Sequence, residues 1–454
     1  MTPMKIHFIA IGGSIMHSLA MVMHAMGHKV TGSDDEIYEP SLSRLATLGL
    51  LPDQMGWHPE KIQKDIDVVV LGMHARADNP ELIKAKELGL NIESFPEFIY
   101  NISKDKTRIV VAGSHGKTTT SGMIAHVLDK CGIKADRMIG AKIGALEPVA
   151  ITDAPIIVLE GDEYLTSPLD PRPKFFHYHP QITIITGIAW DHMNVFPTYK
   201  SYVDQFRQLI ESLGSTDLLI YCAEDEDLVA LVEDVEPVCK FIGYHSHPYS
   251  MSDGMVIIEE DNGLSYPLEI FGNHNLQNLK AAQIATHAIG LSSVEFYSAI
   301  QSFTGASKRL QLLHKSDHVT AYLDFAHAPS KVKATVNAVR EKHPDAYIIA
   351  CLELHTFSSL NPEFLPQYKG ALAEADVKIV YYSPHTLAVK KLPDLSSDQL
   401  ADYFDALDLI VVTSADKLKA AVLASRKDVD SVLLWMSSGR FDGVDLFGVS
   451  SKFL

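Results

Sequence analysis

A glycine-rich turn that ends in lysine and threonine carries the clearest chemistry in this chain. It follows the apolar run of residues 108–112 and consists of Gly113, Ser114, His115, Gly116, Lys117, Thr118 and Thr119. Such a turn before a helix presents N–H groups to phosphate oxygens, while its lysine neutralises their charge and its threonine ligates Mg²⁺. A strict phosphate loop has glycine where this chain has Val111, so the turn is the shorter variant. We expect it to bind ATP; the alternative is a glycine turn without a ligand.

Acidic residues and a histidine follow two other apolar runs. The segment Glu160-Gly161-Asp162-Glu163 comes directly after residues 156–159, and Asp191-His192 ends a second apolar stretch. Parallel α/β folds bind ligands at the carboxyl ends of their strands. Carboxylates with one imidazole suit Mg²⁺, with Mn²⁺ as the alternative. The pattern predicts a metal site beside the phosphate loop, unless these acids are only solvated and His192 only caps a helix.

A second glycine turn lies near the N-terminus and consists of Ala10, Ile11, Gly12, Gly13, Ser14 and Ile15. Two of the three glycines of a dinucleotide fingerprint are replaced by Ala10 and Ile15, which argues against ordinary NAD binding. The turn could still bind a diphosphate. Asp34 follows the next apolar run, after Gly32 and Ser33, and could accept a ribose hydroxyl or cap a turn.

The elements that must position these residues alternate between strand and helix. Strands are predicted at residues 6–11, 29–32, 67–71, 108–112, 156–159, 182–185, 218–221, 320–324, 347–351, 377–381, 409–412 and 432–435, and helices at 16–26, 80–88, from the phosphate loop to about 128, and 275–289. This alternation predicts an α/β protein with parallel sheets. Polar stretches near residues 103–106 and 308–309 suggest three domains, namely 1–106, 107–307 and 308–454.

Composition limits the classes of partner. With 57 acidic against 39 basic residues, the chain of 454 residues has a formal charge of -18, which argues against nucleic acid. Its four cysteines form no CxxC pair, no apolar run approaches 18 residues, and the N-terminus lacks the features of a signal peptide. We expect a cytoplasmic enzyme of small-molecule substrates, without a membrane partner, that is a monomer or homodimer.

Taken in order, these motifs resemble those of the Mur ligase family across nearly the whole chain. The further pieces are His274-Asn275-x-x-Asn278, Arg309 and Asp324-Phe325-Ala326-His327. The resemblance implies three domains: a Rossmann-like domain for a UDP-sugar, a central P-loop ATPase-type domain and a Rossmann-like C-terminal domain for the amine. It also implies an ATP-dependent ligase that forms an amide through an acyl phosphate.

The resemblance also implies roles for single residues. The catalytic residues would be Lys117, Glu160 and His192, and the metal ligands Thr118, Glu160, Glu163 and His192. Besides residues 113–119, ATP would contact Asn275, Asn278, Arg309 and Asp324. The UDP-sugar would contact Gly12, Gly13, Ser14, Ile15, Ser33 and Asp34, and the amine substrate His327 and His355. For the group that deprotonates the amine, the sequence offers His192, His327 and His355.

A missing lysine indicates which branch of the family the chain resembles. Members with a carbamylated lysine carry it about fifteen residues past the histidine of the DH motif, where this chain has Phe206, Arg207 and Gln208. The branch without it acts on UDP-N-acetylmuramate. One of its members adds L-alanine and another adds the recycled tripeptide L-Ala-γ-D-Glu-meso-diaminopimelate. Residues 163–178, 324–327 and 436–441 look more like the second, although Ala328 stands where both usually have a histidine.

Three other classes stay open on the sequence. A P-loop NTPase or small-molecule kinase would keep the phosphate loop without a UDP-sugar or an amine. A NAD-dependent dehydrogenase would use the N-terminal turn. A sugar-nucleotide sensor would bind both nucleotides and release no phosphate.

Overall fold

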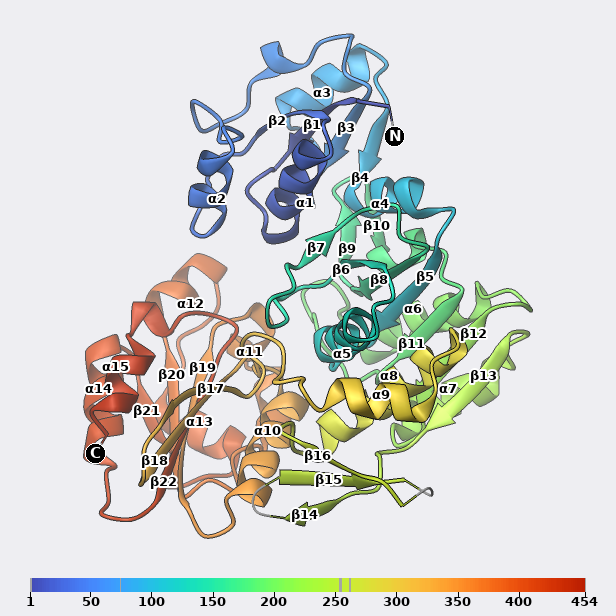
Figure 1. Cartoon of the computed structure of the whole chain (residues 1–454). Helices are drawn as coiled ribbons and strands as arrows, with labels where there is room; N and C mark the ends of the chain where they lie inside the picture. The colour runs from blue at the N-terminus through green and yellow to red at the C-terminus, as the bar shows by residue number, and fades with distance from the viewer. Residues whose placement is uncertain (1, 74, 253–254, 261–262, 454) are drawn as a thin grey trace. The chain divides into compact units, whose positions relative to one another are not determined.

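The computed structural model describes residues 2–73, 75–252, 255–260 and 263–453. They form two compact units. Unit 1 comprises Met1–Ile188, Asp204–Tyr244 and Ala281–Phe296, and unit 2 comprises Ala189–Val203, His245–Lys280 and Tyr297–Leu454. The predicted α/β class is confirmed, since both units contain mainly parallel sheets with helices (Figure 1). Among the described residues, none of the helices is long and apolar enough to cross a membrane.

The N-terminal sheet of unit 1 has four parallel strands in the order β2-β1-β3-β4. Its elements are β1 (Lys5–Ile9), α1 (Ser14–Ala25), β2 (Lys29–Ser33), α2 (Ser41–Thr47), η1 (Pro59–Lys61), β3 (Val68–Leu71), α3 (Pro80–Glu87), β4 (Ile92–Ser94) and α4 (Phe95–Ser103). The first strand was predicted to reach Ile11 but ends at Ile9, because Ala10 takes a left-handed φ of 67° that breaks the extended backbone.

The second sheet of unit 1 has seven strands in the order β13-β12-β11-β5-β8-β6-β7, and only β7 runs antiparallel to its neighbour. Its strands are β5 (Thr107–Ala112), β6 (Ala135–Met138), β7 (Val149–Ala150), β8 (Ile156–Gly161), β11 (Ile182–Ile185), β12 (Leu218–Cys222) and β13 (Lys240–Tyr244). A hairpin, β9 (Leu165–Ser167) and β10 (Asp170–Pro173), precedes η2 (Lys174–His177). The strand before the phosphate loop, β5, therefore lies between the two strands that precede the predicted metal ligands.

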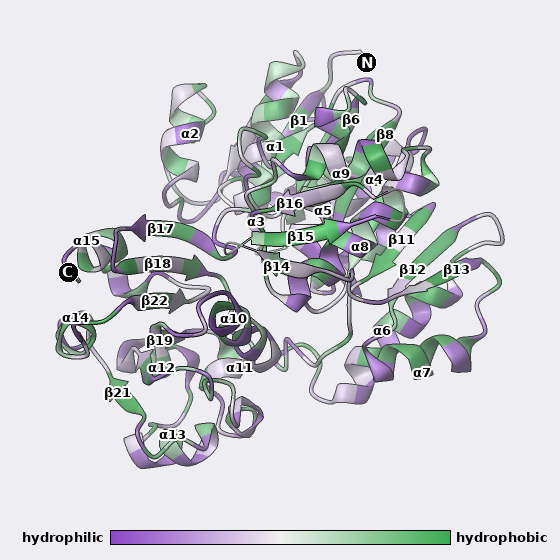
Figure 2. Cartoon of the chain, turned by 60° about the horizontal axis from the view of Figure 1, so that its bottom comes forward, coloured by the Kyte–Doolittle hydropathy of each residue, from purple (hydrophilic) through white to green (hydrophobic). Residues whose placement is uncertain are grey.

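The α-helices between β5 and β17 in the chain are α5 (Lys117–Lys130), α6 (Tyr199–Glu211), α7 (Glu226–Val235), α8 (Asn273–Ala288) and α9 (Ser293–Ile300). Of these, α5 and α7 belong to unit 1, whereas α6, α8 and α9 each have residues in both units. The amphipathic α7 buries Leu228, Leu231 and Val232 and exposes its acidic residues, and its ribbon alternates between hydrophobic and hydrophilic colours in Figure 2. Its N-cap is Asp225, whose side chain accepts the N–H of Leu228 at 3.0 Å.

The main sheet of unit 2 has six strands in the order β17-β18-β22-β19-β20-β21. They are β17 (Gln311–Lys315), β18 (Val319–Asp324), β19 (Tyr347–Leu354), β20 (Val377–Tyr382), β21 (Ile410–Val412) and β22 (Ser431–Met436). Its helices are α10 (Pro329–Lys342), α11 (Phe357–Leu360), η3 (Leu365–Tyr368), α12 (Pro384–Lys390), α13 (Ser397–Phe404), α14 (Ala415–Ala424), η4 (Phe441–Gly443) and α15 (Leu446–Ser451). The sequence missed β17, an exposed antiparallel edge strand, and the meander β14 (Ser250–Ser252), β15 (Met255–Glu259) and β16 (Ser265–Leu268).

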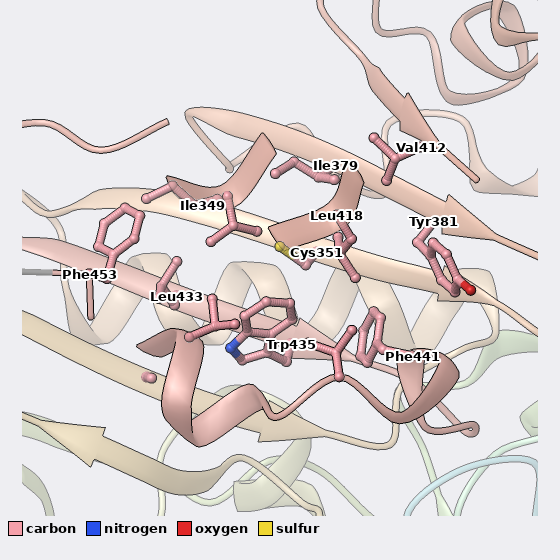
Figure 3. Close-up of a cluster of buried hydrophobic side chains, with 14 of the residues drawn as sticks. Ile349, Cys351, Ile379, Tyr381, Val412, Leu418, Leu433, Trp435, Phe441 and Phe453 are labelled. Carbon is pink, nitrogen blue, oxygen red and sulfur yellow. The ribbon is translucent and has the colours of Figure 1, made fainter. Parts of the chain in front are cut away.

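One face of this sheet packs into a closed hydrophobic core (Figure 3). Trp435 of β22 is fully buried, its ring meets Phe441 edge-on at 5.5 Å, and its Nε1–H donates to Ser450 Oγ at 3.1 Å. Val422 of α14 and Val449 of α15 belong to the same cluster. The indole thus joins the sheet to the helices that cover it.

Trp435→Ala is expected to destabilise unit 2 by about 3–5 kcal/mol, because it removes a large buried side chain and leaves a cavity. Calorimetric unfolding of the whole chain would measure the shift. Val389→Ala is the control, since Val389 is 66% exposed and should change stability by less than about 0.5 kcal/mol. Equal melting curves for the two variants would contradict the assignment of this core.

Candidate active site

The phosphate loop is a tight turn whose backbone favours glycine at two positions. Gly113 has a φ of 124° and Gly116, the N-cap of α5, has a φ of 78°. A Cβ on Gly113 would collide with the side chain of Thr186. The N–H of Ser114 donates to the carbonyl of Gly187 at 2.9 Å, which ties the loop to the end of β11. The loop is therefore held in place from the neighbouring strand, with the start of α5 directly behind it.

Lys117 begins α5 and pairs with Glu163, an acidic residue that follows β8. Its Nζ donates to Glu163 Oε2 at 2.6 Å and to the carbonyl of Gly113 at 2.5 Å. Burial alone would lower the pKa of Lys117, but Glu163, with Asp162 and Glu160 nearby, outweighs burial and raises it. The ammonium is thus fully charged at neutral pH and contacts the first residue of the loop, Gly113.

Glu160, near the end of β8, connects the phosphate loop with the next strand of the sheet. Its Oε1 accepts the hydroxyl of Thr118 at 2.8 Å, and its Oε2 accepts the N–H of Gly140 at 2.7 Å. A carboxylate and a hydroxyl in direct contact are hard oxygen donors of the kind that Mg²⁺ prefers. The donors present in unit 1 therefore fit Mg²⁺.

Lys174 is a residue of this site that the sequence did not single out. Its Nζ lies 2.5 Å from Asp162 Oδ2, and it comes from η2, after the β9–β10 hairpin. Asp162 lies between Glu160 and Glu163 in the chain but points to a different cation. No local pattern marks Lys174, because the hairpin folds it back onto the end of β8.

The N-terminal turn is held closed by Asp34. The N–H of Gly12 donates to Asp34 Oδ2 at 2.7 Å, and the N–H of Ile11 donates to the carbonyl of Ser33 at 3.1 Å. Burial, together with neighbouring Asp35, raises the pKa of Asp34 to about 6, although the bond from Gly12 opposes this shift. Of the two roles considered for Asp34, closing the turn is therefore observed, and contact with a ribose stays a prediction. Ser14 is exposed at the start of α1 and Ile15 is half-buried.

His192 belongs to unit 2, in a segment that packs on the helices of the C-terminal sheet. Its N–H bonds to Asp191 Oδ1 at 2.8 Å, and Asp191 Oδ2 accepts Lys331 Nζ at 3.0 Å. Burial would raise the pKa of Asp191, but Lys331, His192 and His327 hold it well below its usual range. Lys331 was not among the predicted site residues, since it lies 140 positions along the chain from Asp191.

The predicted nucleotide contacts of unit 2 lie near the end of β18 and in the first half of α8. Arg309 stacks over the ring of Phe325 at 4.5 Å. Asp324 accepts the N–H groups of Leu310 and Ala326, each at 2.7 Å, so its carboxylate ties residues 308–310 to the end of β18. In α8, the side chain of Asn275 donates to the carbonyl of Phe271 at 2.8 Å, and Asn278 is buried. Their contacts with ATP stay predictions.

The two histidines assigned to the amine follow two strands of the same sheet, β18 and β19, which are separated by β22. His327 follows β18 and is buried, with Nδ1 2.9 Å from the carbonyl of Phe325, whereas His355 follows β19 and is half exposed. Glu353, buried at the end of β19, accepts the Ser437 hydroxyl and the Phe441 N–H. Carboxyl ends of parallel strands thus bring three segments together, as expected of a ligand site.

His327 is expected to make unit 2 sensitive to acid. Burial, with help from Lys331, lowers its pKa to about 4, against about 6.5 in an unfolded chain. The folded state therefore excludes a proton that the unfolded state takes up, so stability is complete above pH 6.5 and falls as the pH drops toward 4. Between pH 7 and 5 the loss attributable to His327 is about 2 kcal/mol. Urea unfolding of His327→Gln should show a flatter pH dependence, and His385→Gln, at an exposed site, should match the parent chain.

Comparison with known proteins shows to which family this chain belongs. Residues 5–107 match the model of the "Mur ligase family, catalytic domain", and residues 111–286 match the "Mur ligase middle domain". A UDP-N-acetylmuramate–L-alanine ligase of Lacticaseibacillus casei is 31% identical over 83% of this chain and 84% of that protein. The chain belongs to the Mur ligase family. The predictions of an ATP-dependent ligase and of a Mur-type three-domain architecture are confirmed, whereas the bounds predicted for the three domains stay predictions.

Two further relatives match nearly the full length of this Mur ligase. The UDP-N-acetylmuramate–L-alanyl-γ-D-glutamyl-meso-2,6-diaminoheptandioate ligase of Haemophilus influenzae is 28% identical over 97% of both chains. The crystal structure of a murein peptide ligase from Psychrobacter arcticus superposes with a TM-score of 0.68 at 23% identity, covering 99% of this chain and 98% of that one. The first similarity concerns sequence and the second shows the fold.

Proposed function

We propose that this Mur ligase joins the carboxylate of UDP-N-acetylmuramate to the amine of L-Ala-γ-D-Glu-meso-diaminopimelate, at the expense of ATP. The proposal rests on the phosphate loop, whose Lys117 and Thr118 contact the carboxylates of Glu163 and Glu160. The choice of amine is supported by the relative that names this tripeptide, which is 28% identical over 97% of the chain, whereas an L-alanine ligase is 27% identical over 92% of it.

The chemistry divides into two displacements. A carboxylate oxygen of the sugar attacks the γ-phosphorus of ATP and ADP leaves, so that an acyl phosphate forms. The free amine then attacks the acyl carbon and phosphate leaves, which produces the amide. Lys117 and the N–H groups at the start of α5 neutralise the charge that spreads over the transferring oxygens.

Thr118 and Glu160 would hold Mg²⁺, with Glu163 and His192 as further ligands, and Mn²⁺ is the alternative ion. The bound cation would neutralise phosphate charge. For the group that deprotonates the amine, His192, His327 and His355 all stay candidates. Burial lowers the pKa of His327 to about 4, so it is neutral at pH 7 but a weak proton acceptor. In this proposal His355 contacts the amine substrate from the end of β19. A cytoplasmic location and a monomeric or homodimeric state stay predictions.

Phosphate release with ATP, Mg²⁺ and UDP-N-acetylmuramate tests the proposal when the tripeptide is compared with L-alanine. Faster release with the tripeptide, and its amide seen by mass spectrometry, is the expected result. A preference for L-alanine would make the enzyme a synthetic ligase. Phosphate release without either amine or sugar would favour a P-loop kinase or NTPase, and binding without release would favour a sensor.

A further inference from the structure

The loop that carries His192 is fastened to elements far away in the sequence. The N–H of Met193 donates to Ser358 Oγ at 3.3 Å, and the ring of Trp190 meets Phe364 edge-on at 6.1 Å. Asp191 pairs with Lys331 of α10 at 3.0 Å. All of these contacts lie within unit 2, so the loop that follows β11 in the chain is part of the C-terminal unit.

A single carboxylate performs two tasks in this loop. One oxygen of Asp191 receives the Lys331 ammonium, and the other accepts the backbone N–H of His192. His192 has a φ of 56°, a left-handed conformation that costs a non-glycine residue about 1 kcal/mol or more. The carbonyl of His192 also accepts the N–H groups of Val195 and Phe196, at 2.8 and 2.9 Å. The turn at His192 is therefore kept by hydrogen bonds, and the first of them depends on Asp191.

Lys331 is the partner that keeps Asp191 in this position. The side chain of Asp191 is 8% exposed and that of Lys331 is 22% exposed, so water compensates little for the loss of either partner. Removal of one member of such a pair leaves an uncompensated buried charge, which is strongly destabilising to the local arrangement. Without Lys331, Asp191 would turn toward water and release the N–H of His192.

We propose that Lys331 is a positioning residue for His192, which it orients through Asp191 from the first turn of α10. The inference rests on the proposed function in one respect, the use of His192 as a ligand of the metal that accompanies ATP. In this arrangement the histidine is presented by the C-terminal unit. The orientation of His192 therefore depends on the contact of its loop with α10, and Lys331 maintains that contact.

The first test is hydrogen–deuterium exchange of the peptide covering residues 189–198 in the full chain. Lys331→Met should speed exchange in this peptide by at least about tenfold. Lys331→Arg should restore protection in large part, since a guanidinium also donates to a carboxylate. Lys333→Met is the matched control, because Lys333 is exposed two residues along the same helix. Equal exchange in the Lys331→Met and Lys333→Met variants would overturn the proposal.

The second test separates positioning from a structural role. In Lys331→Met, the Mg²⁺ concentration for half-maximal turnover should rise by about 10–100-fold, while the affinity for the UDP-sugar stays unchanged. Adding Asp191→Asn to Lys331→Met should cause no further rise over Asp191→Asn alone, because both act through one contact. Faster exchange with an unchanged Mg²⁺ requirement would overturn the link to His192. If Lys331→Met showed faster exchange but the parent chain itself had no ligase activity, the proposed function would be wrong. The role of Lys331 in holding the loop of residues 189–198 on α10 would then still stand.

Discussion

Lys117→Met is expected to lower the turnover of ATP by about 10³-fold or more, because it removes the cation that faces the transferring phosphoryl group. Binding of UDP-N-acetylmuramate should not change, since its predicted turn lies on the separate four-stranded sheet. Phosphate release measures the first effect and titration calorimetry the second. Lys130→Met, at the exposed end of the same helix, is the control and should keep full activity.

Lys117→Met is also expected to lower the stability of the folded chain. Glu163 is fully buried and its carboxylate pairs with Lys117, so Lys117→Met leaves a buried charge alone at a cost of about 3–5 kcal/mol. The double variant Lys117→Met/Glu163→Gln should recover most of that stability and none of the turnover. Normal turnover in Lys117→Met would refute the assignment of the phosphate loop. Recovery of turnover in the double variant would mean that the single variant had failed through misfolding.

Glu160→Ala is expected to reduce turnover by about 10²–10³-fold and to raise the Mg²⁺ requirement, since it removes a hard oxygen ligand at the carboxyl end of β8. Glu160→Gln should retain an acceptor for the Thr118 hydroxyl at reduced charge, and we expect an intermediate loss. Turnover measured against Mg²⁺ and Mn²⁺ concentration distinguishes a metal ligand from a structural acid.

Asp153→Asn is the matched control for Glu160, because Asp153 is an exposed acid just before β8. It should leave both turnover and the Mg²⁺ requirement unaltered. If Glu160→Ala kept the parent's Mg²⁺ requirement, Glu160 would serve only to tie Thr118 and Gly140 together.

Local elements were predictable where the physical cause is local. The strand at residues 182–185 was predicted with its observed bounds, since a short run of buried apolar residues between polar segments has few other options. The edge strand β17 was missed because most of its residues are exposed and carry no alternating pattern. The first strand was placed two residues too long, because the left-handed backbone at Ala10 leaves no mark in an apolar run.

The sequence by itself determined the phosphate loop. Its glycines, its lysine and the helix that follows lie within a few residues of one another, so the conformational freedom of glycine and the start of the helix are enough to define it.

Only the tertiary structure decided which charges meet. Thr118 reaches Glu160 42 positions away, Lys117 reaches Glu163 46 positions away, and Lys331 reaches Asp191 across 140 positions. The first two pairs exist because the order β11-β5-β8 places the ends of these strands side by side, and the third because the loop after β11 docks on α10. Strand order and loop docking follow from packing among segments that are distant in the sequence, so no local sequence pattern predicts them.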